Sequence, residues 1–132
     1  LVRHIAVNDS GEVINPLLLG GQVHGGVARG IGQALMEDVT YDSDGQILAG
    51  SFMDYCMPRA DDLPMIETAD FVEACQTNPL GVKGGGESGT VGSTAAVVNA
   101  IIDALAEYGV KDIDMPATPM KVWQAMHGGK AA

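Results

Sequence analysis

The chain has 132 residues and a mass of 13.6 kDa, with 46% hydrophobic and 18% charged residues, a composition typical of a folded domain or a piece of one and not of a disordered chain. Seven basic against seventeen acidic residues give a formal net charge of -10, and the scattered Lys and Arg form no basic stripe, which argues against nucleic acid as a partner. No apolar stretch reaches the roughly 18 residues that span a bilayer, and the N-terminus lacks the layout of a signal peptide. A cytoplasmic protein without a membrane span is therefore expected, and Leu1 in place of Met suggests a fragment or a processed product.

The first half of the chain predicts a strand and a glycine-rich helix. "HIAVND", residues 4–9, alternates like a strand, and "SGE" after it indicates a turn. From Gly21 onward, Val23, Val27 and Ile31 recur at the period of an amphipathic helix, which the glycines at 25, 26, 30 and 32 interrupt. Because each interior glycine costs a helix about 1 kcal/mol relative to alanine, another segment or a ligand is expected to pack against the smooth face.

The second half predicts a hairpin, a strand and two further helices. Residues 39–50 contain a "DSDG" turn between two short strand patterns, and residues 65–74 form a further strand. A strong helix begins at Thr90, with its apolar face on Ala96, Val97, Ala100, Ile101, Ala104 and Leu105, and Gly109 caps it. Thr118 followed by Pro119 starts a short closing helix. Strands and helices without strict alternation favour the α+β class.

The two cysteines carry no recognisable metal or redox pattern. Cys56 and Cys75 lack CxxC spacing and a neighbouring pair of histidines, so buried free thiols in a reducing compartment are predicted and a zinc site is not.

Glu87 lies in the glycine-rich stretch "GVKGGGESGT" and is the main candidate for chemistry. An acid before a helix start is stabilised by the helix dipole, which needs no function. Alternatively, glycines on both sides leave the carboxylate uncovered, so that it faces a ligand and acts as a general base. Gly84, Gly86 and Gly89 also match GxGxxG, but without a good strand before the loop or an acidic strand end after it, so a nucleotide-binding module is a weak alternative.

Polar residues near the two glycine clusters each have a plain interpretation and a functional one. Gln22 is a surface amide or bonds a polar ligand edge, and His24 is solvated or a satisfied core histidine rather than a metal ligand. Lys83 is expected to be solvated, with phosphate contact as the alternative. Ser88 caps the following helix or donates to an oxyanion.

Four stretches, in order and over nearly the whole chain, resemble the C-terminal part of the molybdopterin-binding large subunit of the molybdenum hydroxylases, the superfamily of xanthine dehydrogenase, aldehyde oxidase and carbon monoxide dehydrogenase. They are "VINPLLLGGQVHGGVARGIGQALMED", "FMDYCMPRADDLP", "NPLGVKGGGESGTVGSTAAVVNAIIDAL" and "MPATPMKVWQAM". The resemblance implies that residues 1–132 are one α+β C-terminal segment of a cofactor-binding domain, with a small mixed sheet and packed helices. The first turn departs from the pattern, because the family often has "DCG" where this chain has "NDSG".

The resemblance also implies roles for individual residues. Glu87 matches the family's glutamate beside the molybdenum, whose implied role is that of general base in hydroxylation or oxidation of an aldehyde, an N-heterocycle or carbon monoxide. Gln22 matches the glutamine that contacts the pterin, and Gly85, Gly86 and Ser88 would be neighbours of the metal centre or of the cofactor. No protein ligand to the metal is implied.

The resemblance further implies partners. Iron-sulfur clusters and FAD are expected on other subunits or domains, together with the remainder of the large subunit and a small-molecule substrate. Export to the periplasm through a signal on a partner is the alternative to the cytoplasm. A non-catalytic interaction subunit or relic, in which Glu87 is idle, remains the competing hypothesis.

Overall fold

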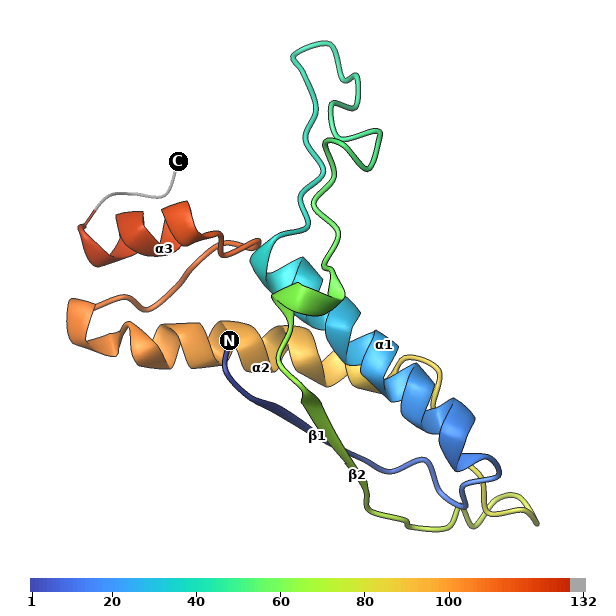
Figure 1. Cartoon of the computed structure of the whole chain (residues 1–132). Coiled ribbons are helices and arrows are strands. Elements are labelled where there is room, and N and C mark those ends of the chain that lie inside the picture. The colour runs from blue at the N-terminus through green and yellow to red at the C-terminus, as the bar shows by residue number, and fades with distance from the viewer. Residues whose placement is uncertain (129–132) are drawn as a thin grey trace. The chain divides into compact units, whose positions relative to one another are not determined.

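The computed structural model describes residues 1–128 and shows three α-helices, two short 3-10 helices and two strands within them. Strand β1 (His4–Asn8) pairs in parallel with β2 (Ile66–Asp70). Helices α1 (Pro16–Leu35), α2 (Ser88–Ala104) and α3 (Pro119–Met126) account for most of the regular structure (Figure 1). The class is α+β, as predicted, but the sheet is purely parallel and not mixed.

The chain divides into two compact units that are each built from separate segments. The first unit comprises residues 1–30 and 59–93, and the second comprises residues 31–58 and 94–132. Both long helices therefore contribute residues to each unit.

In the first unit, the start of α2 packs directly on the middle of α1, and glycines make this close approach possible. A Cβ on Gly89 would lie 2.5 Å from the carbonyl oxygen of Val23, and one on Gly30 would lie 2.7 Å from Ser93 Cβ. Ser93 Oγ donates to the Val27 carbonyl at 3.1 Å, and Thr90 Oγ1 donates to the Gly26 carbonyl at 3.0 Å. The glycine-rich face of α1 thus packs against the start of α2, as predicted for another segment of the chain. Val23 and Val27 are buried at this crossing.

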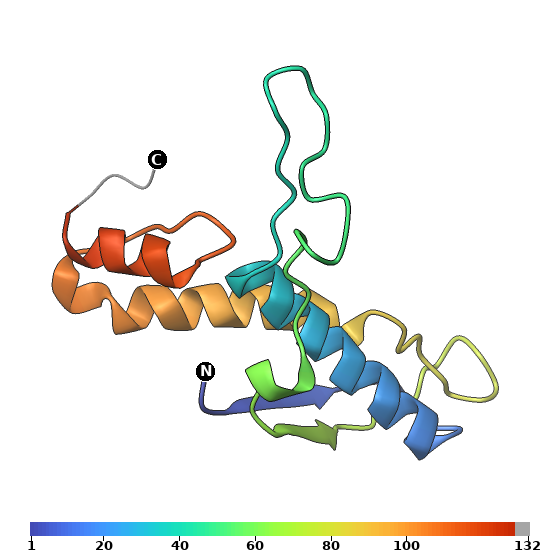
Figure 2. The same ribbon diagram turned by 45° about the horizontal axis from the view of Figure 1, so that its top comes forward.

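The second unit contains the other half of each long helix and the closing helix. Ile31 and Ala34 of α1 are buried here, as are Val97, Leu105 and Ala117. Figures 1 and 2 both show α3 running alongside α2. Thr118 caps α3 as predicted, because its side chain accepts from the Lys121 N–H and Pro119 occupies the first turn.

Residues 39–58 leave the end of α1 as a long arm, visible in Figures 1 and 2. The predicted turn is present, with Asp42 Oδ1 accepting from the backbone of Asp44 and Gln46 and with Gly45 at φ 80°. The two predicted strands are not, since only the Tyr41–Ile47 bridge forms. Ala49 alone is buried in residues 39–50, so little apolar burial supports a longer ladder.

Several element boundaries and burial predictions were wrong. Helix α1 begins at Pro16 instead of Gly21, because Asn15 Oδ1 accepts from the Leu18 N–H and caps the first turn. Helix α2 ends at Ala104, and Gly109 in the left-handed region closes the 3-10 turn Ala106–Tyr108. Cys56 is exposed and Cys75 half-buried, so neither is the buried thiol that was predicted. The alanines expected on the buried face of α2 are exposed: Ala96, Ala100 and Ala104.

Among residues 1–128, none of the helices combines the length and the apolar character that a membrane crossing requires.

Candidate active site

The N-terminal end of the glycine-rich loop, residues 81–83, is anchored to the turn that follows β1. The Lys83 N–H donates to the Ser10 carbonyl at 2.9 Å, and Gly11 forms an antiparallel bridge with Val82. Gly11 has φ 60°, and a Cβ there would lie 2.2 Å from the Gly81 carbonyl oxygen, so only glycine fits this position. The two backbone segments are therefore held in one register directly before the loop.

An ion pair strengthens the same anchor. Lys83 Nζ lies 2.5 Å from Asp9 Oδ2, while Asp9 Oδ1 accepts from the backbone N–H groups of Gly11 and Glu73. These contacts, the lysine first and the Gly11 N–H second, hold the pKa of the Asp9 carboxyl below its usual value. Lys83 was predicted to be solvated; instead, it ties the loop to the turn after β1.

Four of the predicted site residues meet at the far end of the loop. Gln22 on α1 donates through Nε2 to the Gly86 carbonyl at 2.6 Å, although 64 positions separate them in the sequence. Ser88, the first residue of α2, donates through Oγ to the Gly85 carbonyl at 3.1 Å. The structure thus brings Gln22, Gly85, Gly86 and Ser88 into one hydrogen-bonded group.

Glu87 lies between these anchors and is exposed. Its carbonyl accepts from the N–H groups of Thr90 and Val91 and so belongs to the first turn of α2. Within residues 1–128, its carboxylate has neither a hydrogen-bond donor nor a cation as partner. A carboxylate on a fixed backbone, with no internal partner, is free to meet a ligand.

The loop backbone also offers unused donors. Over the described part of the chain, the N–H groups of Gly84, Gly85 and Gly86 find no acceptor, and they lie just before the N-terminus of α2. A Cβ added to Gly84 or to Gly86 would meet no atom within 4 Å. Free N–H groups, open space and a helix N-terminus together suit an anionic group that lies against the backbone, so the donor set fits the phosphate-bearing molybdopterin that the resemblance implies.

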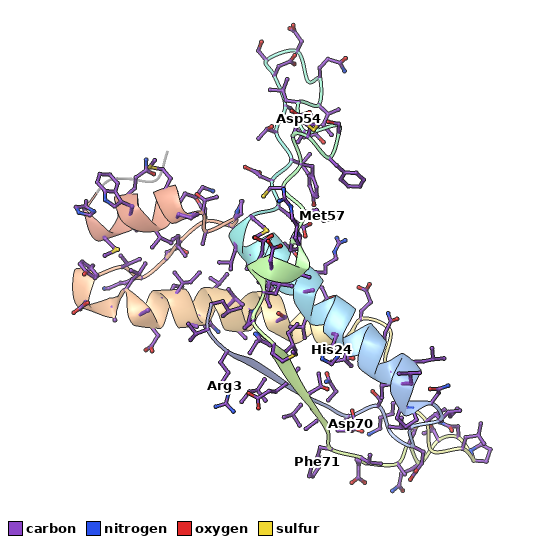
Figure 3. All side chains as sticks on the ribbon, viewed as in Figure 1. Arg3, His24, Asp54, Met57, Asp70 and Phe71 are labelled. Carbon is purple, nitrogen blue, oxygen red and sulfur yellow. The ribbon has the colours of Figure 1, made fainter. Side chains whose placement is uncertain are left out.

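His24 links α1 to β2 near this site but does not belong to it. Its Nδ1 lies 2.7 Å from the Gly20 carbonyl oxygen and its Nε2 lies 3.1 Å from that of Ile66. Figure 3 labels it on α1. In the described residues, no three His, Cys, Asp or Glu side chains gather as metal ligands would.

The sequence interpretation missed Asp9 and Ser10. The "NDSG" turn was noted only as a departure from the family pattern, yet this turn supports the glycine-rich loop through side chain and backbone. The GxGxxG match, by contrast, lacks its structural context. Residues 71–87 separate β2 from α2, and no strand follows α2 in residues 105–128, so the βαβ unit of a dinucleotide fold is not formed there.

Comparison with known proteins finds relatives of this chain in sequence. Residues 1–64 match the family model described as the molybdopterin cofactor-binding domain. The chain is 42% identical over 123 residues to the nicotine 6-hydroxylase large subunit of Paenarthrobacter nicotinovorans, covering 93% of this chain and 15% of that protein. It is 38% identical to the carbon monoxide dehydrogenase large chain of Hydrogenophaga pseudoflava, covering 94% of this chain and 15% of that one.

The fold agrees with the sequence matches. The solved structure of reconstituted CO dehydrogenase from Oligotropha carboxidovorans superposes with a TM-score of 0.90 at 36% identity, over 96% of this chain and 16% of that chain. The α+β prediction is confirmed. The chain is related in sequence and fold to the molybdopterin-binding large subunits of the molybdenum hydroxylases, and it spans about 15% of the length of the curated relatives.

Proposed function

We propose that residues 1–132 are the C-terminal segment of the large subunit of a molybdenum-dependent hydroxylase or dehydrogenase, in which Glu87 is the general base. The observation that carries this proposal is the Glu87 carboxylate, exposed and without a partner in residues 1–128, on a loop whose two ends are hydrogen-bonded in place. An acid needed only for the helix dipole would not require such a scaffold. A general base does, because proton transfer depends on reach within about 3 Å.

In this proposal, the loop and α1 hold the cofactor. Gln22 uses one N–H for the Gly86 carbonyl, which leaves its amide oxygen and second N–H for a polar cofactor edge. The unused N–H groups of Gly85 and Gly86, with the helix start at Ser88, donate to cofactor oxygens. When bound, molybdopterin supplies a metal that activates the nucleophile and takes up the electrons of the substrate. Glu87 takes the proton of the nucleophile.

The surface of the first unit and the relatives support the proposed partners. Large apolar side chains are exposed on the first unit, among them Ile5 and Val7 of β1 and, labelled in Figure 3, Phe71. Such side chains suit burial against the remainder of the large subunit. Iron-sulfur and flavin subunits or domains would carry electrons away, in the cytoplasm or, with a signal on a partner, in the periplasm. The relatives act on nicotine and on carbon monoxide by their names, so an aldehyde, an N-heterocycle and carbon monoxide are the substrate classes to screen.

The test is Glu87→Gln in the native protein, purified with its partners through a C-terminal tag. Molybdenum content is measured in the same sample by mass spectrometry. We expect turnover to fall by about 10²- to 10⁴-fold, the usual contribution of a general base, with molybdenum and subunit composition unchanged. The matched control is Glu107→Gln, an equally exposed glutamate in the second unit, which should retain full turnover.

Two results would overturn the proposal. Wild-type protein without molybdenum, purified alone from its host, would favour a non-catalytic relic. A Glu87→Gln protein that is fully loaded with molybdenum and turns over at the wild-type rate would show that Glu87 is idle.

A further inference from the structure

The Ser10 side chain is buried without a hydrogen-bond partner. Ser10 is 5% exposed, and its Oγ finds no donor or acceptor in the described chain. Its carbonyl is used, because it accepts from the Lys83 N–H, so the turn is fixed while the hydroxyl is left over. A buried hydroxyl without a partner destabilises a fold, and alanine at such a position would be neutral or better. The hydroxyl therefore needs an explanation other than folding.

This hydroxyl lies close to Gly85 of the glycine-rich loop. A Cβ built on Gly85 would be 3.3 Å from Ser10 Oγ and 2.7 Å from Leu19 Cδ1. The backbone N–H of Gly85 also lacks an acceptor within residues 1–128. A donor without an acceptor and a hydroxyl without a partner thus lie close together, two residues before Glu87.

We infer that Ser10 is a positioning residue for Glu87. In the working enzyme, its buried hydroxyl accepts a hydrogen bond from the Gly85 N–H and so fixes the position of the glycine-rich loop that carries Glu87. Ser10 does not touch cofactor or substrate in this assignment. It acts through Gly85, whose lack of a side chain lets the loop settle onto the hydroxyl. The inference rests on the proposed function, because it gives Ser10 a purpose only if the place of Glu87 matters.

The test is Ser10→Ala in the native protein, with thermal stability, molybdenum content, kcat and KM measured on one preparation. We expect unchanged molybdenum and KM, a melting temperature lowered by no more than in Ser93→Ala, and a kcat lower by roughly five- to tenfold, which is the worth of one neutral hydrogen bond. Ser10→Cys, which restores a larger and weaker hydrogen-bonding group, should recover part of kcat.

Ser93→Ala is the matched control. Ser93 is also buried in the first unit, at 3% exposed, but its Oγ already donates to the Val27 carbonyl. Its removal should lower the melting temperature while kcat at a temperature where the protein is folded stays at the wild-type value. The comparison of the two variants therefore distinguishes a hydroxyl whose loss affects stability alone from one whose loss affects turnover.

Wild-type kcat in Ser10→Ala would overturn the inference. If Glu87→Gln is inactive while Ser10→Ala is fully active, the assignment of Ser10 fails and the proposed function stands. If Glu87→Gln is itself fully active, the proposed function fails first.

Discussion

The glycines at the crossing of α1 and α2 lie in tightly packed surroundings, whereas Gly84 and Gly86 in the loop before α2 lie in open space. At the crossing in the first unit, a Cβ added to Gly26, Gly30 or Gly89 would approach another atom to 3.0 Å or less. In the loop, a Cβ added to Gly84 or to Gly86 would meet nothing within 4 Å. The glycines of the crossing are required because the two helices pack closely there. The two loop glycines leave space that no other part of the chain fills.

The comparison teaches how to weigh a glycine-rich sequence. Interior glycines cost helix α1 about 1 kcal/mol each relative to alanine, and the crossing offsets this through buried Val23 and Val27 and two hydroxyl-to-carbonyl bonds across the helices. Gly84 and Gly86 in the loop gain nothing comparable inside the chain. Because their N–H groups are also unused and lie just before the N-terminus of α2, these two glycines point to a molecule outside the chain.

The largest effect is expected at the crossing. Gly89→Ala places a Cβ 2.5 Å from the Val23 carbonyl oxygen and 2.9 Å from the Val27 nitrogen, both backbone atoms that can yield only if the helices separate. We expect a loss of about 3 kcal/mol or more in the free energy of unfolding, at the upper end of overpacking effects, measured by urea titration.

Gly92→Ala is its control in the same helix. Gly92 has no atom within 4 Å of the added Cβ, so alanine should stabilise the protein by about 0.5 to 1 kcal/mol. Equal losses in the two variants would contradict the view that the crossing, and not helix propensity, selects glycine at position 89.

The second prediction concerns the open space in the loop. Gly86→Ala should leave the unfolding free energy within about 0.5 kcal/mol of wild type, because the methyl group meets no atom of the chain. If the cofactor occupies this space, the methyl group collides with it, and molybdenum retention should weaken roughly ten- to hundredfold, the effect of about 1 to 3 kcal/mol of overpacking. Dialysis against a chelator followed by metal analysis measures the retention. Full retention would mean that the cofactor lies elsewhere.

The smallest effect is expected at the base of the loop. The Asp9 carboxyl has a lowered pKa in the fold, chiefly through Lys83, so its contribution to stability is present above its unfolded pKa of about 3.9 and is lost as the pH falls through the folded value. Asp9→Asn should therefore be less stable than wild type at pH 7, and the difference should shrink as the pH falls below about 3.9.

Urea titrations at several pH values measure this difference. Because the pair is partly exposed, high salt should reduce it as well. Asp103→Asn, which removes an exposed acid of α2, is the matched control for the loss of one carboxylate. A constant difference between Asp9→Asn and wild type at all pH values would show that Asp9 acts through shape alone.

Much of the fold could be predicted from the sequence because local patterns decided it. The alternation in "HIAVND" gave β1, and the Thr118-Pro119 pair gave the start of α3. The start of α1 was predicted too late because Gly20 and Gly21 are poor helix formers and argued against a helix there. The helix in fact begins at Pro16, after the cap at Asn15. The predicted hairpin at 39–50 failed for the opposite reason: its local pattern was sound, but no packing partner supports it in the described chain.

The site could be predicted only in part. Glu87, Gln22 and the loop glycines carried a recognisable motif, and the structure does bring Gln22 to Gly86. The base of the site was beyond sequence reasoning, because the Asp9–Lys83 pair and the place of Ser10 close to Gly85 join residues about 75 positions apart without a repeating pattern. The catalytic role of Glu87 stays a prediction.

The division of the chain into interleaved units has a consequence for synthesis. The first unit needs residues 59–93 to complete it, and the second needs residues 94 onward, so neither is finished when residues 1–30 have left the ribosome. Helix α1 would emerge with its glycine face uncovered until the start of α2 follows it. A nascent chain stalled before residue 88 should therefore be a client of holding chaperones, and one released shortly after residue 93 should already protect its first unit from proteases.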